Sequence, residues 1–159
     1  MTHYEERLEQ DLARLREGVA AVGEKVQKAL DNAVRALLER DHELAYSTVL
    51  GDMPINRDVR GIDRRCHVFV ARHLPSSGHL RFVSSVMRLN VALERIGDYA
   101  VAISREAVQL TDAPPSTVAR DIDQPNAPAI VVAVCSALFL GERFVKREVG
   151  EQDDGDGRK

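Results

Sequence analysis

Two carboxylates stand four residues apart in the stretch LERIGDYA, residues 93–100 of the 159-residue chain. On an α-helix, Glu94 and Asp98 project about 40° from each other, so they share one side of the helix. A bare carboxylate pair at this spacing repels itself, and a bound cation removes that cost. The pair therefore indicates a candidate metal site. The alternative is that both acids lie on a solvated helix face, which is common for such a spacing.

A second stretch of the chain offers further oxygen ligands. Asp52, Asn56 and Asp63 fall within about 40° of one another around a helix axis. If this edge faces Glu94 and Asp98, four or five oxygen ligands converge, which suits Mg, Mn or Fe and, as a weaker match, Ca. The set contains no His or Cys at ligand spacing, which argues against a zinc site. Taken singly, Asn56 and Asp63 are also typical of surface positions.

Three long amphipathic stretches carry these residues. Apolar or small residues recur in steps of four and three, the pattern of a helix packed in a bundle. The first series is Leu8, Leu12, Leu15, Val19, Val22, Val26, Ala29, Ala33 and Ala36; the second is Ala45, Thr48, Asp52, Ile55, Val59, Ile62, Cys66, Phe69 and His73; the third is Phe82, Val86, Leu89, Leu93, Ile96, Ala100, Ile103, Ala107 and Leu110. Because short breaks between helices favour antiparallel neighbours, the sequence predicts an all-α, antiparallel up-down-up three-helix bundle.

Pro54 interrupts the second series. It has no N–H to donate to the carbonyl four residues back, so we expect the helix to kink or to start afresh near this residue. If the helix starts afresh, Asp52 is a good N-cap, because its side chain can accept hydrogen bonds from the free amides that follow. The cap and the metal ligand are equally good interpretations of Asp52.

Arginines recur every seven residues along the third series, at Arg81, Arg88 and Arg95. Such a row is either a solvent-exposed surface of the bundle or a site that binds an anion or an acidic partner.

Composition narrows the class of protein. A formal net charge of -3 argues against binding of nucleic acid by bulk electrostatics. Cys66 and Cys135 are too few for a disulfide framework, and the acidic, polar start is not a signal peptide, so we expect a cytoplasmic protein. The apolar stretch 127–140 is shorter than the roughly 20 residues that a membrane-spanning helix needs, so we expect no membrane span. A di-iron enzyme would need Glu-x-x-His pairs on facing helices, and none is evident, which argues against that class of enzyme.

The stretch LRFVSS at 80–85, followed by LERIGDYA at 93–100, closely resembles the third helix of the PhoU family. These proteins are regulators that accompany the high-affinity phosphate transporter. Upstream, residues 29–37 resemble the first helix of the family, and Asp41, Leu44, Ala45 and the stretch 52–56 resemble its second helix. The resemblance covers residues 5–110 in the expected order and spacing.

The resemblance implies two three-helix bundles in tandem, each with a Glu/Asp-x-x-x-Asp motif that holds clustered metal ions on the bundle surface in some members. Carried over to this chain, the motif falls on Glu94 and Asp98, with Asp52 and Asn56 as the matching pair of the second helix. The resemblance implies that the chain is not an enzyme. Family members resemble adaptors, often dimeric, that damp phosphate uptake and keep the phosphate-sensing histidine kinase inactive when phosphate is plentiful. The implied partners are the ATPase of the phosphate ABC transporter, the sensor histidine kinase and a second copy of the chain.

Residues 1–110 supply one complete bundle of this kind, and residues 111–159 depart from the family. We expect a linker at 111–115, then a partial additional helix from a truncated or divergent second repeat, and a disordered tail from about residue 150. The stretch 124–144 does not resemble the family, which suggests that the middle of the repeat is read in a shifted frame. His79 stands where the family usually has Asp. The alternative functions are a remnant that folds without regulating, or a metal-binding helical protein with another role.

Overall fold

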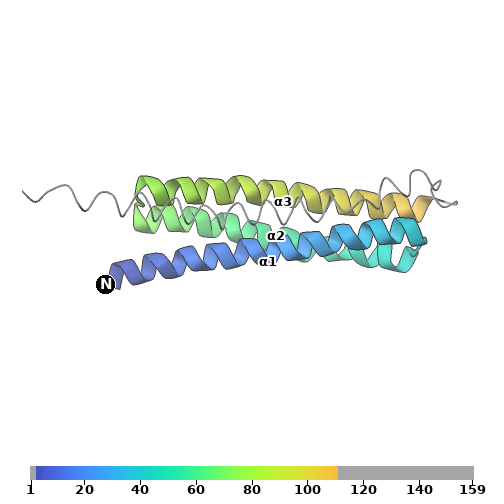
Figure 1. The fold of residues 1–159 in the computed structure, drawn as a ribbon, viewed down its shortest axis with the longest axis horizontal. Helices are drawn as coiled ribbons and strands as arrows, with labels where there is room; N and C mark the ends of the chain where they lie inside the picture. The colour runs from blue at the N-terminus through green and yellow to red at the C-terminus, as the bar shows by residue number, and fades with distance from the viewer. Residues whose placement is uncertain (1–2, 111–159) are drawn as a thin grey trace, which may run out of the picture.

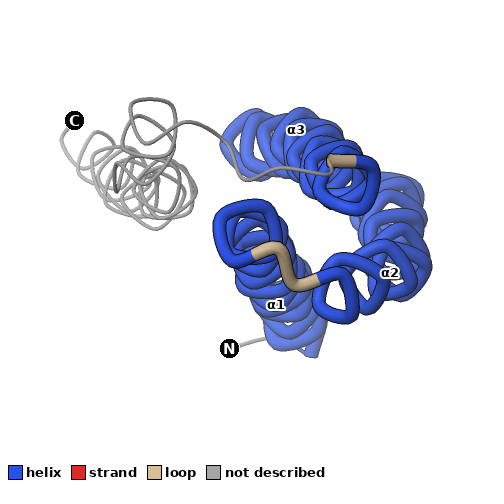
Figure 2. Tube along the Cα trace, turned by 90° about the vertical axis from the view of Figure 1, so that its right-hand side faces the viewer, coloured by secondary structure: helices blue, strands red, loops and turns tan. Residues whose placement is uncertain are grey.

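A computed structural model describes residues 3–110 of the chain as three α-helices, α1 (His3–Glu39), α2 (His42–His73) and α3 (Ser77–Gln109). Figure 1 shows the three helices side by side along one long axis, and each of them contacts the other two. Viewed along that axis in Figure 2, they lie at the corners of a triangle. The predicted all-α, up-down-up bundle is confirmed. The linker, the partial helix, the second repeat and the tail predicted for 111–159 lie outside the described residues.

Both connections between the helices are short because the chain reverses at a residue with positive φ. Arg40 has φ 60° after α1, and Leu74 has φ 43° after α2. The left-handed conformation ends a helix and turns the chain away from its axis. Asp41 then begins α2 as its N-cap, with its side-chain oxygen accepting from the Leu44 amide at 2.9 Å. Local backbone chemistry therefore sets the antiparallel order of the helices.

The core forms along the predicted stripes of α1 and α2. Every member of the first predicted series is buried except Ala29, which is half-buried, and every member of the second is buried except Asp52. The largest side chains with almost no exposure include Phe69, Leu12, Leu15, Ile62 and Leu93. The four-three spacing thus located the core face of these two helices correctly.

The core face of α3 differs from the prediction. The buried residues include a row spaced by seven, Val83, Asn90, Gly97 and Ser104. Three members of the predicted series, Phe82, Ile96 and Ile103, are only half-buried. Asn90 is buried because its Nδ2 donates to the Val59 carbonyl oxygen of α2 at 2.8 Å. A search for apolar residues misses this row, because Asn and Ser are polar and Gly has no side chain.

Of the two outcomes expected at Pro54, a kink or a new start of the helix, the new start is wrong. α2 runs without interruption from His42 to His73 with Pro54 inside it, and its N-cap is Asp41. Proline removes one backbone hydrogen bond. Burial of Thr48 and Ile55 on either side holds both halves of the helix against the core, and Pro54 itself is exposed. Asp52 therefore does not cap a helix, which removes one of its two interpretations.

A buried polar cluster joins the start of α1 to the end of α2. His73 is 4% exposed, and its Nε2 lies 2.9 Å from Oδ2 of Asp11. Because a carboxylate only accepts hydrogen bonds, this nitrogen is the donor. Tyr4 donates its hydroxyl to the backbone oxygen of His73 at 2.6 Å. The hydrogen bond from His73, assisted by the charge of Arg72 and opposed by burial, lowers the pKa of Asp11 below 3.8.

Replacing Asp11 by Ala should destabilise the bundle, because the buried Nε2–H of His73 loses its acceptor. We expect the free energy of unfolding to fall by about 1–3 kcal/mol at pH 7, measured by urea unfolding. The contribution of Asp11 is present above the ordinary carboxyl pKa of 3.8 and is lost as pH falls through its lowered pKa. The stabilities of the wild type and of Asp11→Ala should therefore converge below pH 3.8.

Asp31→Ala is the matched control, because it removes an exposed carboxylate from the same helix. We expect it to leave stability nearly unchanged. An Asp11→Ala protein as stable as the wild type at pH 7, or a difference that persists at the lowest pH, would contradict this account of the cluster.

Candidate functional site

Asp52 of α2 lies against α3 at Gly97. A Cβ atom placed on Gly97 would be 3.8 Å from Oδ1 of Asp52 and 3.9 Å from Cγ2 of Ile55. Gly97 is the residue immediately before Asp98 and three residues after Glu94. Asp52 therefore lies next to the part of α3 that carries the carboxylate motif. The predicted set of metal ligands stays a prediction.

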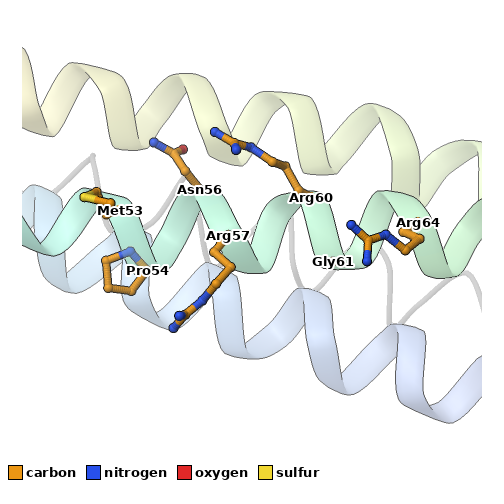
Figure 3. A pocket seen from close by; sticks show the side chains of 7 residues that line it. All are labelled: Met53, Pro54, Asn56, Arg57, Arg60, Gly61 and Arg64. Atoms are coloured by element: carbon orange, nitrogen blue, oxygen red, sulfur yellow. The ribbon is translucent and has the colours of Figure 1, made fainter.

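Asn56 lies one helical turn after Asp52 and contacts it on the same side of α2. Its Nδ2 donates to Oδ2 of Asp52 at 2.6 Å. Its Oδ1 is buried and has no hydrogen-bond partner among the described residues. Figure 3 shows the side chains of Asn56 and Arg60 extending from α2 toward α3. A buried oxygen without a donor costs about 1–3 kcal/mol, so this position favours a ligand that binds oxygen.

The α3 side of the groove carries uncompensated negative charge. Glu94 is half-buried and Asp98 is exposed. Within residues 3–110, neither of them forms an ion pair or a side-chain hydrogen bond, and Asp52 has only the Asn56 amide as a partner. Each of these three acids of α2 and α3 therefore lacks a cationic partner within residues 3–110.

Asp63 does not belong to this group. It lies eleven residues from Asp52, which is about 16 Å along the axis at 1.5 Å per residue. Its Oδ2 lies 3.5 Å from Nδ1 of His67 instead. One ion cannot bind both aspartates at that separation. Asp52 and Asp63 share a direction around the helix axis, but the rise along the axis separates them.

The donor set fits a hard cation in an open site. All the donors are carboxylate or amide oxygens, the ligands that Mg and Mn prefer, and Mg keeps several water ligands in proteins. In the part of the chain that the structure describes, no three His, Cys, Asp or Glu side chains already converge as a metal site. A metal held by Asp52, Asn56, Glu94 and Asp98 would therefore need water ligands and rotation of the two α3 side chains.

A basic groove on α2 adjoins these acids, and the sequence interpretation missed it. It has a volume of about 740 Å³, and Figure 3 shows the residues that line it, which are Met53, Pro54, Asn56, Arg57, Arg60, Gly61 and Arg64. The prediction followed the core stripe of α2, and the groove was missed because its arginines lie on the opposite side of the helix. The signal available in the sequence was the same four-three spacing, counted from Tyr46 along the outer side.

The fold defines the class of this protein as an all-α three-helix bundle. The sequence profile of the PhoU domain matches residues 19–107. The chain therefore belongs to the PhoU family, as its motifs predicted. Accessory proteins of this family are not enzymes, which agrees with the expectation from the sequence.

Individual relatives support the assignment. The chain is 36% identical over 110 residues to a phosphate-specific transport system accessory protein PhoU homolog of Pseudomonas putida, covering 69% of this chain and 43% of that protein. It is 32% identical over 99 residues to the PhoU protein of Escherichia coli, covering 62% and 41%. The crystal structure of PhoU from Pseudomonas aeruginosa superposes with a TM-score of 0.63 at 27% identity, over 89% of this chain and 64% of that one.

The chain spans less than half the length of these curated relatives. Within residues 3–110, none of the helices combines the length and the apolar character required to cross a membrane.

Proposed function

We propose that this chain is a negative regulator of phosphate uptake and of phosphate-responsive gene expression. It would act as an adaptor between the ATPase of a phosphate ABC transporter and a phosphate-sensing histidine kinase, at the cytoplasmic side. The observation that supports this proposal is the PhoU domain at 19–107, shared with accessory proteins of phosphate-specific transport systems. An elongated bundle also offers several long faces, which suits a protein that contacts more than one partner.

A second copy of the chain is part of the proposal. Residues 3–110 form one three-helix bundle, and the matched segment is less than half of each of these relatives. Two copies related by symmetry would present two bundles, and paired copies are the commonest oligomers of soluble proteins. We therefore propose a homodimer as the active form.

The groove between α2 and α3 is the proposed metal site. Asp52, Asn56, Glu94 and Asp98 would hold Mg, Mn or Fe, and the ion would supply positive charge that balances the carboxylates of both helices. The chain's own residues position these donors. Gly97 admits the Asp52 carboxylate, and Asp52 orients the Asn56 amide.

Removal of the α3 carboxylates should abolish the metal site without unfolding the bundle, because neither side chain is buried in the core. We expect the wild-type chain to bind Mn²⁺, followed by the loss of its free-ion EPR signal. Glu94→Ala/Asp98→Ala should bind at least about tenfold more weakly.

Asp63→Ala is the control, since this aspartate lies about 16 Å from Asp52 along α2. It should bind Mn²⁺ like the wild type. Equal Mn²⁺ binding by the wild type and the double variant would rule out this groove as the metal site.

Deleting the gene tests the regulatory role. We expect the deletion strain to take up more phosphate and to express a phosphate-repressed reporter more strongly in high-phosphate medium. A plasmid carrying the wild-type chain should restore repression. Leu12→Asp should not restore it, because Leu12 is 1% exposed and a charge there disrupts the core. If the deletion changes neither uptake nor reporter, the chain folds without regulating, and the proposal is wrong.

A further inference from the structure

The side of α2 that faces away from the core carries a second series in steps of four and three. Its members, which we call the outer α2 face, are Tyr46, Leu50, Met53, Arg57, Arg60 and Arg64. The exposures of the three apolar side chains are 58%, 76% and 80% in that order. Large apolar residues in a row, rather than scattered singly, mark an interaction surface. The same stripe continues with three arginines, so the face is apolar at one end and basic at the other.

The three arginines of this face form no close ion pair in the described part of the chain, and the charge of Arg57 acts at longer range on Asp58. Arg57, Arg60 and Arg64 are exposed, and within residues 3–110 none of them forms an ion pair or a side-chain hydrogen bond. They line the groove of about 740 Å³ with Met53 and Gly61, where a glycine leaves room between the long side chains. Guanidinium groups bind carboxylates through paired hydrogen bonds, so this groove suits acidic side chains.

We infer that the outer α2 face binds one helical segment of a partner protein, with apolar residues at one end and carboxylates at the other. Steps of four and three form the seam along which one helix packs against another. From Tyr46 to Arg64 the face extends about 27 Å, the length of five helical turns. This inference rests on the adaptor role proposed above and gives the chemistry of one of its partners.

An anionic membrane fits this surface less well than a helix. Asp52 lies on the α3 side of α2, and α3 itself carries Glu94 and Asp98, so a flat negative surface laid on the arginines would also approach acids. A single helix can place its carboxylates on the arginine row alone. Neighbouring basic and acidic stripes thus select a partner with its own charge pattern, because like charges placed opposite each other are repelled.

A designed peptide tests the inference directly. The probe is a fluorescein-labelled helical peptide of five turns, with three Leu in one half and three Glu in the other at four-three spacing, made with the halves in both orders. We expect the full chain to bind one order, measured by fluorescence anisotropy. The same peptide with Lys in place of Glu should bind at least about tenfold more weakly. Added salt should weaken the binding of the Glu peptide.

Two matched double variants locate the binding surface. Arg57→Gln/Arg64→Gln on α2 should weaken binding of the Glu peptide by about threefold to tenfold. Arg88→Gln/Arg95→Gln on α3 removes the same charge at the same spacing from another exposed face, and it should leave the affinity unchanged. Leu50→Gln, which changes an exposed apolar residue of the other half, should also weaken binding. Circular dichroism checks that each variant keeps its helices.

Several outcomes overturn the inference. If both double variants lose the same peptide affinity, the peptide is held by general electrostatic attraction and not by this face. If no peptide binds at about 1 mM, the face is not a helix-binding site. Binding to vesicles of anionic lipid that depends on Arg57 and Arg64, without peptide binding, would identify a membrane instead. If the peptide binds only after the acids of the stretch 148–156 are neutralised, the occupant is the chain's own end. If no peptide binds but deletion of the gene raises phosphate uptake, the outer α2 face is not a helix-binding site, and the proposed regulatory role is unaffected.

Discussion

The close packing of α3 on α2 is the constraint on which the polar features of this bundle depend. It is made by a row of small or polar residues spaced by seven, of which Asn90 bonds to the α2 backbone and Gly97 faces Asp52 and Ile55. A larger apolar residue at Gly97 would hold the helices apart by the width of its side chain. Without the close approach, Asp52 would lie farther from the stretch of α3 that contains Gly97.

This packing also separates the charges of α2 onto two sides. The edge that faces α3 presents Asp52 and the Asn56 amide, the outer face presents Arg57 and Arg64, and Arg60 lies at the border and extends toward α3 beside Asn56. Pairing between the two sides would cancel both, yet no such ion pair forms within the described residues. One helix therefore offers both a cation-binding edge and a carboxylate-binding face, which is consistent with a small module that recognises more than one ligand or partner.

Residue types predicted the helices well and their contacts less well. The stripes from Leu8 to Ala36 and from Ala45 to His73 were correct, because periodicity within a single helix is visible in its own sequence. The new helix start expected at Pro54 was wrong, since one lost hydrogen bond is a local cost and the core contacts on both sides oppose it. Asp63 was grouped with Asp52 because the two residues share a direction around the helix axis, and their separation along the axis was not considered. Asn90 and Ser104 were missed because polar residues are not expected in a core.

The sequence by itself determined that the chain forms long helices in a bundle and that it belongs to the PhoU family, because helical periodicity and a specific motif are local properties of the chain. Only the tertiary structure decided which residues from different helices meet. The bond of His73 to Asp11, 62 residues away, and the contact of Asp52 with Gly97 both depend on the axial register between helices. Periodicity gives the direction in which a side chain points, but register also requires the packing of two surfaces, which no single helix encodes.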